Sequence, residues 1–363
     1  MLARTGDPAP GGGIYDQDLA GVTLSESGEA VFAFELQSKK LVRVTGSHAE
    51  GLYRCAADTG KTEALVIPGT TPAPGSGVFE SCGMRPVLNR SGDLVFAAAV
   101  HVPADLHLPD DLGLGIFVLD RNGRMAKIVA AGDPAPGGGR FDFAQNPWIN
   151  QAGDIAFGGH VRGEPCNSQG ALPFCGESVY LRPAGKAIES IAHQGEYGPG
   201  NMRYLYAWGP LLNDRRELVY MGELMPVPGA REGRGIFWRG PAGSMPVALP
   251  EDPAPDGRTI AIVNPSRLIT NYWLNNRGDI AFNAALRNGD SAFYVYSGGL
   301  LHLIAGTGTV IPGIGKVASV ASFSIHGGVM NGRGQVLFWA TMTDGRGVLL
   351  IATPGATGHG GKR

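Results

Sequence analysis

Aromatic, amide, guanidinium and imidazole side chains collect in the short segments that lead into a turn recurring along this chain. Arg85 lies in CGMRPVLN, Trp148 in AQNPWIN and His326 in IHGGVMN. The candidate ligand-binding residues are Arg85, Asn146, Trp148, Tyr206, Trp208, Asn271, Trp273 and His326. Aromatic faces beside hydrogen-bond donors suit a sugar or another small polar ligand. The alternative is that the aromatic residues pack between structural units and that Arg85 is paired within the wall.

The same segments hold side chains that could act in catalysis. Arg85, Tyr206 and His326 are candidates for charge-stabilising, acid and base roles in a polysaccharide lyase or glycoside hydrolase. The candidate carboxylates for glycoside hydrolysis are Glu80, Asp142, Glu196 and Glu223. No spacing sets a distance between them, and the chain has no Ser-His-Asp, HExxH or phosphate-loop pattern. We favour binding over catalysis, because Trp, Tyr and Asn outnumber acids in these segments.

Histidines and acids in or beside the long loops within two adjacent repeat units could bind a metal. They are His101, His107 and His160, with Asp110 and Asp111. Imidazole and carboxylate ligands in this mixture suit a metal ion. No two of these residues share a diagnostic spacing, so we expect no metal site and no cofactor.

A further set of oxygen-bearing side chains occupies one position of a recurring connector, GDPAPGGG, which is found intact twice. The set consists of Asp7, Thr71, Asp133, Glu196, Asp252 and Thr309. Four acids and two threonines could hold calcium. We favour the alternative, in which these short side chains accept hydrogen bonds from neighbouring backbone N–H groups and fix the loop.

Four cysteines bear on the compartment. Cys166 and Cys175 bracket the segment CNSQGALPFC, which suits a disulfide that closes a surface loop, and Cys55 and Cys82 could form a second. An even number of cysteines so placed favours an oxidising compartment. The alternative is four unpaired thiols. The spacing does not fit a zinc–thiolate site.

The turns belong to a repeat with a period of roughly 60 residues. Six segments align without gaps: LSESGEAVFAF, LNRSGDLVFAA, INQAGDIAFGG, LNDRRELVYMG, LNNRGDIAFNA and MNGRGQVLFWA. They share the pattern Asn-x-x-Gly-x-x-x-Phe. Asn and Gly are typical of hairpin turns, since Asn tolerates a positive φ or caps the turn and Gly supplies a positive φ without a Cβ clash, and the aromatic residue predicts a buried strand. The pattern is therefore explained by structure alone.

Each unit contains four short apolar runs separated by turn signals. Units of four antiparallel strands repeated in tandem are typical of a β-propeller. We predict an all-β, six-bladed β-propeller, with a parallel β-solenoid as the weaker alternative. The last unit ends after its third strand, so we expect a strand at about residues 2–6 to pair with residues 347–353 and close the ring.

We expect one propeller domain over residues 1–354. The predicted blades span about 14–70, 80–132, 144–195, 205–250, 268–306 and 325–353 with 2–6. Residues 355–363 are expected to form a disordered tail. The turns within each unit are short, whereas the loops between its second and third strands vary in length. We expect any ligand site on that long-loop face, near the mouth of the central channel, because functional residues concentrate on variable loops.

The tandem Asn-x-x-Gly-x-x-x-Phe units, alternating with GIF-type strands and AAGDPAPG-type connectors, resemble a bacterial group of tandem-repeat proteins. Members of that group are mostly secreted or anchored at the cell surface. The resemblance covers essentially the whole chain, and it implies a propeller and an exported location. It carries no catalytic residues to transfer.

The amino-acid composition limits the kinds of partner that we expect. The formal net charge of −2 gives no field for nucleic acid or an anionic membrane. No apolar run is long enough for a transmembrane helix, and the N-terminus lacks the apolar centre of a signal peptide. We expect a monomer in the extracellular space or periplasm, which binds a glycan or protein partner and does not insert into a membrane. The alternative is an enzyme acting on a polysaccharide at the same channel mouth.

Overall fold

The fold is described from a computed structural model of the chain. The structure describes residues 2–25, 27–37, 49–75, 77–82, 86–101, 114–164, 166–167, 174–225, 233–264, 271–321 and 330–354. Over these residues the chain is almost entirely β, with a single 3-10 turn at Pro199–Asn201. The expected tail at 355–363 lies outside the described residues.

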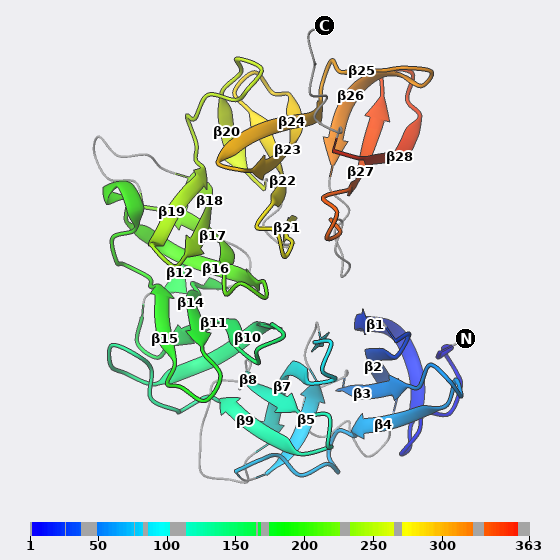
Figure 1. The fold of residues 1–363 in the computed structure, drawn as a ribbon. Coiled ribbons are helices and arrows are strands. Elements are labelled where there is room, and N and C mark those ends of the chain that lie inside the picture. Colours follow the sequence, from blue (N-terminus) through cyan, green and yellow to red (C-terminus); the bar gives the residue numbers. More distant parts are fainter. Residues whose placement is uncertain are drawn as a thin grey trace, which may run out of the picture. The chain divides into compact units, whose positions relative to one another are not determined.

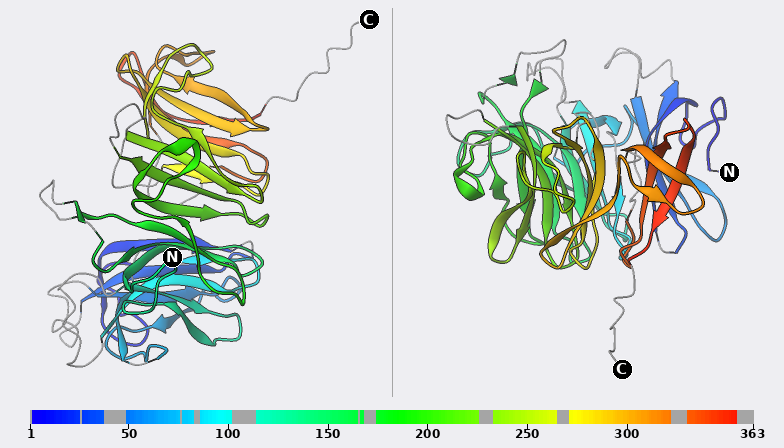
Figure 2. Two further views of the ribbon diagram at one scale, coloured as in Figure 1. Left: turned by 90° about the vertical axis from the view of Figure 1, so that its left-hand side faces the viewer. Right: turned by 90° about the horizontal axis from the view of Figure 1, so that it is seen from above.

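The chain divides into two compact units. Unit 1 comprises Met1–Glu196 and Tyr206–Leu212, and unit 2 comprises Tyr197–Leu205 and Asn213–Arg363. Each unit is built from antiparallel sheets whose strands follow one another in chain order (Figure 1). The strands of each sheet twist, as the two views of Figure 2 make visible.

Three sheets lie in unit 1. Sheet 1 consists of β1 (Ile14–Leu24), β2 (Ala30–Gln37), β3 (Ala49–Cys55) and β4 (Thr62–Val66). Sheet 2 consists of β5 (Val78–Cys82) and β6 (Val87–Leu88), which both pair with β7 (Leu94–His101), followed by β8 (Leu114–Leu119) and β9 (Met125–Val129). Sheet 3 consists of β10 (Phe141–Ile149), β11 (Ile155–Val161), β14 (Ser178–Arg182) and β15 (Glu189–Ala192). A small ladder of β12 (Cys166–Asn167) and β13 (Phe174–Cys175) lies between β11 and β14 in the chain.

Three further sheets complete the fold. Sheet 4 consists of β16 (Tyr204–Leu212), β17 (Leu218–Leu224), β18 (Gly233–Gly240) and β19 (Gly243–Ala248). Sheet 5 consists of β20 (Ile260–Val263) and β21 (Tyr272–Leu274), which both pair with β22 (Ile280–Leu286), followed by β23 (Ser291–Ser297) and β24 (Leu300–Gly306). Sheet 6 consists of β25 (Val310–Ile311), β26 (Gly315–Ala321), β27 (Val336–Met342) and β28 (Gly347–Ala352). The described chain therefore contains six antiparallel sheets of at least four strands each.

The recurring Asn forms the turn between the first and second strands. In sheet 3, Asn150 Oδ1 accepts from the N–H groups of Ala152 (3.0 Å) and Asp154 (2.9 Å), and Gly153 has a φ of 79°. A residue with a Cβ is strained at that φ, which explains the Gly of the repeat. The Asn amide group also donates to the carboxylate of Asp154 (3.0 Å). The turn is thus held by side chains, as the pattern predicted.

The same Asn links successive sheets. Asn89 Nδ2 donates to the main-chain oxygen of Asn150 (3.2 Å), and Asn275 Nδ2 donates to that of Asn331 (3.2 Å). Each pair joins equivalent residues of neighbouring repeats. Because the next repeat places a main-chain oxygen opposite this amide, the recurring Asn aligns one turn on the next within each unit.

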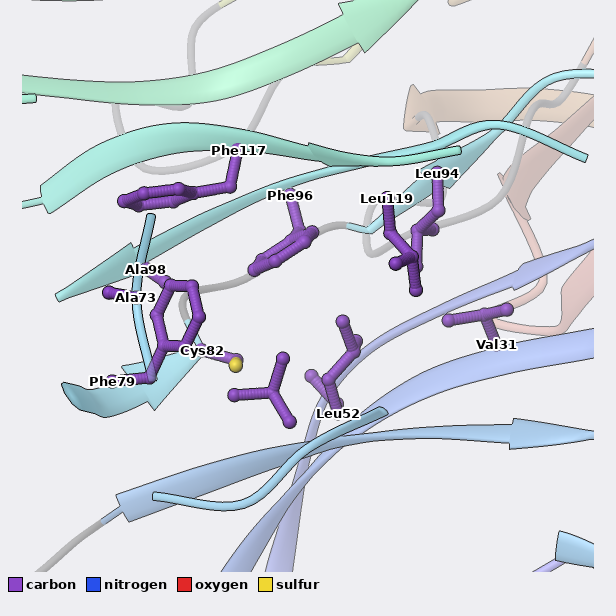
Figure 3. Packing of buried hydrophobic residues seen from close by; sticks show 12 residues of the cluster. Val31, Leu52, Ala73, Phe79, Cys82, Leu94, Phe96, Ala98, Phe117 and Leu119 are labelled. Carbon is purple, nitrogen blue, oxygen red and sulfur yellow. The ribbon is translucent and has the colours of Figure 1, made fainter. Parts of the chain in front are cut away.

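The core lies between neighbouring sheets. Phe96 of β7 and Phe117 of β8 are stacked with centroids 6.0 Å apart, and Phe79 of β5 meets Phe117 edge-on at 4.9 Å. On the other side of this cluster, Val31 and Leu52 of sheet 1 are fully buried (Figure 3). The repeat aromatic therefore packs against the preceding sheet, and its neighbours in the strand face the following one.

The connector GDPAPGGG folds in the same way at each copy. At the second copy, Gly132 N–H donates to the oxygen of Phe141 (2.7 Å) and Phe141 N–H donates to that of Asp133 (2.9 Å). The Asp133 side chain accepts from Ala130 N–H (2.9 Å). Equivalent bonds run from Ile67 N–H to Thr71, from Leu249 N–H to Asp252 and from Gly306 N–H to Thr309. The expected loop-fixing role of this position is confirmed at these four residues.

The start of the chain differs from the expectation. Leu2–Gly6 has no strand structure; its Leu2 oxygen accepts a bond from the Thr62 hydroxyl (3.3 Å), and Gly6 N–H donates to Tyr15 oxygen (2.8 Å). A strand needs a neighbour that pairs with its backbone, whereas within unit 1 the described bonds of this segment are turn bonds and side-chain bonds such as Thr5 Oγ1 to the Asp16 oxygen (2.8 Å). The expected pairing with residues 347–353 joins residues of different units and stays a prediction.

The expected disulfide between Cys55 and Cys82 is wrong, because both are free and buried. Cys55 packs with Tyr15 and Tyr53 in one cluster, whereas Cys82 lies among Phe79 and its neighbours in another (Figure 3). Burial raises the pKa of the Cys82 thiol far above its usual range. The spacing of these two cysteines therefore reflects two separate apolar sites.

Candidate functional site

One rung of each sheet differs in chemistry from repeat to repeat. It is formed by the third residue after the repeat aromatic and by the residue that faces it across the second and third strands. We call it the loop-end rung, because it adjoins the loop between those strands. The facing pairs are Glu35–Glu50, Ala99–Leu114, Glu223–Arg234, Ala285–Ser291 and Thr341–Gly347. In sheet 3 the corresponding residues, His160 and Glu177, lie just beyond the Gly159–Ser178 pair.

In sheet 1 the rung holds two carboxylates. Glu35 is 3% exposed and faces Glu50 directly. The Ser81 hydroxyl of β5 donates to the Glu50 carboxylate, and Glu50 N–H donates to Ser81 Oγ (3.2 Å). The rung of sheet 1 is thus bonded to the first strand of sheet 2.

In sheet 3 the rung places a buried carboxylate over a glycine. Glu177 is 2% exposed, and Gln145 Nε2 donates to its Oε1 at 2.6 Å. A Cβ on Gly158 would lie 1.9 Å from Glu177 Oε2, so the carboxylate occupies the space of a side chain on β11. Its main-chain oxygen accepts from Ala207 N–H (2.7 Å). Tyr206 packs on Gly176, where a Cβ would come within 2.9 Å of the ring.

Two histidines of unit 1 are paired with acids. His160 is buried, stacks on Phe143 (5.6 Å between centroids) and has Nδ1 3.4 Å from Asp142 Oδ2. His193 Nε2 lies 3.1 Å from Glu164 Oε1, and this hydrogen bond raises the pKa of His193 above its ordinary value. The carboxylate of Glu164 therefore favours the protonated imidazole of His193.

In sheet 4 the rung is an ion pair. Arg234 Nε lies 3.4 Å from Glu223 Oε2, with both side chains largely buried. Arg234 Nη1 also donates to the main-chain oxygen of Asn264 (2.7 Å) in sheet 5. The positive and negative charges neutralise each other, and the guanidinium fixes the end of β20.

Sheet 5 has two buried amides near its rung. Asn271 and Asn283 are 6% and 7% exposed, and the Oδ1 atom of each has no hydrogen-bond partner in the described structure. Asn271 directly precedes Tyr272, which pairs with Phe282, so the two amides lie across from one another. A buried acceptor without a donor is rare in proteins and indicates a missing partner.

The described ligand residues that the sequence predicted lie on or directly before the first strands of sheets 3, 4 and 5. Asn146 has a φ of 53° in a bulge of β10 between Gln145 and Trp148, and both Asn146 and Trp148 are half-buried. Tyr206 is buried with its ring 5.7 Å from half-buried Trp208. Trp273 is buried in the cluster between sheets 5 and 6, and its ring centroid lies 6.4 Å from that of Phe293. Arg85 and His326 lie outside the described residues, as does His107.

Among the described residues, no three His, Cys, Asp or Glu side chains gather closely enough to hold a metal ion. The acid beside His160 is Asp142, which was not one of the predicted metal ligands. Asp110 and Asp111 lie outside the described residues, and His101 occupies the last position of β7. Cys166 and Cys175 face each other in the β12–β13 ladder.

Sequence reasoning missed Glu35, Glu177 and Arg234. A signal for Glu35 was present, since a charged residue three positions after the repeat aromatic interrupts an otherwise apolar strand in VFAFEL, as Glu223 does in LVYMGEL. Such a residue is buried with its strand and must find a partner there. The facing residue on the third strand could have been found only by aligning that strand as well.

Fold and rungs together define a repeat protein of antiparallel four-stranded sheets, in which one face of the repeat is uniform and the opposite strand ends vary. The chain belongs to a family of unknown function (DUF7453), whose model matches residues 1–348. No curated protein sequence matches it. No helix in the described part of the chain is long and apolar enough to cross a membrane.

Several solved structures are similar to this chain over nearly its full length. The GH93 α-L-arabinofuranosidase of Fusarium graminearum is 10% identical, with 97% of each chain covered and a TM-score of 0.43. A gluconolactonase from Xanthomonas campestris is 13% identical over 95% of this chain and 91% of its own, with a TM-score of 0.37. The Trypanosoma rangeli sialidase is 9% identical over 96% of this chain and 58% of its own, with a TM-score of 0.38. These values indicate nothing about ligand or activity.

Proposed function

We propose that this protein is an exported six-bladed β-propeller that binds a glycan at the loop-end rungs of its sheets. The observation that supports binding at this end is the contrast between the two ends of the repeat. The turn end uses the same Asn in the same hydrogen bonds in successive sheets. The loop-end rung holds carboxylates, an ion pair or small residues at one and the same position.

Such variation is what a ligand site requires in a repeat protein. A scaffold position keeps its chemistry from repeat to repeat, whereas an asymmetric ligand meets different groups in each. The aromatic and amide residues near these rungs, Tyr206, Trp208, Asn271 and Asn283, suit stacking on a sugar ring and bonding to its hydroxyl groups. We therefore retain these residues, with Asn146 and Trp148, as the proposed binding set.

Ring closure forms part of the proposal. β28 is the last strand of sheet 6, where it pairs with β27. Two of its side chains, Leu349 and Ile351, are 54% and 67% exposed. An apolar edge strand left open invites association. We propose that residues 2–6 pair with this edge, so that residues 1–354 form a single domain and the protein is a monomer.

The second candidate function is catalysis on a polysaccharide. The buried Glu177, held by Gln145 and next to the His160 position, favours it, since a positioned carboxylate and imidazole can exchange protons with a substrate. Against it, Glu223 is neutralised by Arg234 and Glu50 is bonded to Ser81.

One screen separates the two functions. A panel of polysaccharides and oligosaccharides is tested for retention by the immobilised protein and for release of reducing ends or unsaturated products. Retention without product supports binding. Turnover that is lost in Glu177→Gln would support the catalytic function instead of binding. Retention of a protein from the same preparation, with no glycan bound, would indicate a protein ligand instead of a glycan.

A further inference from the structure

The first strand of sheet 5 is interrupted beside an unsatisfied amide. β20 ends where Val263 pairs with Ala284, and β21 resumes where Tyr272 pairs with Phe282. Asn283 is the β22 residue between these two pairs. Its main-chain oxygen accepts from Asn264 N–H (2.9 Å), which closes the first half of the ladder. Asn271 precedes the second half.

Asn271 and Asn283 lie on one side of the sheet. Trp273 pairs with Ala281, and both belong to the buried cluster shared with Phe293 and Phe338. Because strand residues alternate in direction, Asn271 and Asn283 face the same side as Trp273 and Ala281. Two amides and an indole are therefore brought to one face of one sheet, all within unit 2.

The amide oxygens of this pair have no donor. Both residues are more than nine-tenths buried, and neither Oδ1 accepts a hydrogen bond in the described structure. An apolar residue of similar size would fill the same space without an unsatisfied acceptor. Their presence therefore opposes stability unless something outside the described chain donates to them.

The surrounding charges restrict what that donor is. Among the described residues, Arg234 bonds to the Asn264 oxygen beside the strand break, and it is itself paired with Glu223. This pair leaves no net charge to attract a carboxylate, a sulfate or an ammonium group. Amide oxygens accept from neutral hydroxyl groups, and two of them side by side match two hydroxyls of one sugar ring.

We propose that Asn271 and Asn283 form a subsite for adjacent hydroxyl groups of an uncharged sugar. This inference rests on the proposed function, since it names the ligand class of the same loop-end site. The sugar hydroxyls donate to the two Oδ1 atoms, and Trp273 forms part of the wall behind them.

The experiment combines binding with thermal stability. Wild type, Asn271→Leu and Asn283→Leu are titrated with cellotetraose, mannotetraose, chitotetraose and tetragalacturonate, and each protein is melted without ligand. His302→Ala, at an exposed position on β24 of the same sheet, is the control. Asn271→Ala and Asn283→Ala replace the Leu variants if either Leu does not fold.

We expect at least one neutral tetrasaccharide to bind and tetragalacturonate to bind more weakly. Each Leu variant should lose about tenfold or more in affinity, while its melting temperature equals or exceeds that of wild type, because an unsatisfied acceptor has been removed. His302→Ala should change neither quantity.

Three results would overturn the inference. Leu variants that melt lower and bind as wild type would make the amides structural. Stronger binding of tetragalacturonate would exclude an uncharged ligand and leave the proposed function standing. Competition by glycerol at the concentration of the sugar would indicate a polyol site. Failure of the wild type to bind any oligosaccharide in the panel or the wider screen would instead defeat the proposed function itself.

Discussion

The side-chain amide of Asn213 donates a 3.1 Å hydrogen bond to the main-chain oxygen of Asn275, which occupies the same place in the next repeat. Asn275 repeats the bond to Asn331. The turn end of unit 2 is thus held by a chain of identical contacts. That uniformity makes the sheet-to-sheet variation at the opposite strand ends informative.

Replacing Asn213 by Ala should lower the free energy of unfolding by about 1–3 kcal/mol. The change removes the acceptor for Arg215 N–H and Glu217 N–H and the donor to Asn275 oxygen. Urea denaturation measures this change in the free energy of unfolding. Asn122→Ala, at an exposed turn position, is the control and should change stability little. An equal effect of the two substitutions would contradict the inter-sheet role of the amide.

Gly158→Ala should expel the Glu177 carboxylate from its place over β11. The new Cβ would stand 1.9 Å from Glu177 Oε2, so the side chain must move or the strand must shift. We expect the free energy of unfolding to fall by about 1–3 kcal/mol, as at other overpacked sites. The double variant Gly158→Ala with Glu177→Ala should recover part of it, since the two residues contact each other. Strict additivity in this double-mutant cycle would show that the glycine serves another purpose.

The four cysteines should separate into two classes. Cys55 and Cys82 are buried free thiols, and burial raises the pKa of Cys82, so both should resist alkylation until the protein unfolds. Cys166 and Cys175, which face each other in their ladder, should appear as one linked peptide in non-reducing mass spectrometry. Four alkylated thiols after unfolding without reductant would remove the disulfide and, with it, the argument for an oxidising compartment.

His193 should make stability depend on pH. Its hydrogen bond to Glu164 raises the pKa of His193 in the folded state, with Glu196 acting in the same direction. The stabilisation of the folded state by protonated His193 is therefore fully present below the pKa of His in the unfolded chain, about 6.5. It is lost as pH rises through the higher pKa of the folded state. Urea denaturation at pH 6 and pH 9 should show this loss in wild type and a smaller one in Glu164→Gln. An unchanged difference in that variant would assign the pH dependence to other groups.

Deleting residues 2–6 tests the proposed closure. If this segment pairs with β28, its loss should speed hydrogen–deuterium exchange at Gly347–Ala352 and leave β11 at the centre of sheet 3 unchanged. The exposed Leu349 and Ile351 should also promote association at high concentration, which light scattering detects. Identical exchange of β28 in both proteins would mean that the edge has no such partner.

Much of the architecture followed from the sequence because its signals are local. The turn of Asn150 and Gly153, the strand around each repeat aromatic and the capping by Asp133 each depend on a few adjacent residues. The break between β20 and β21 was not predicted, since it is defined by pairing with β22.

The site was harder to predict because its contacts are long-range. Gln145 and Glu177 meet although they are 32 residues apart in the chain, and Arg234 bonds to Asn264, which follows a strand of another sheet. The cysteine spacing misled for the same reason, as Cys55 and Cys82 belong to separate clusters between sheets. Only the aromatic and amide types near the site were visible in the sequence.

Hydrogen–deuterium exchange with and without the oligosaccharide retained most strongly in the screen tests the central claim most directly. Peptides that cover the loop-end rungs, including Leu218–Leu224, Gly233–Gly240 and Ile280–Leu286, should exchange more slowly when the sugar is bound. Peptides that cover the Asn-x-x-Gly turns should not change. Protection confined to those turns, or none at any rung with the sugar bound, would contradict the account.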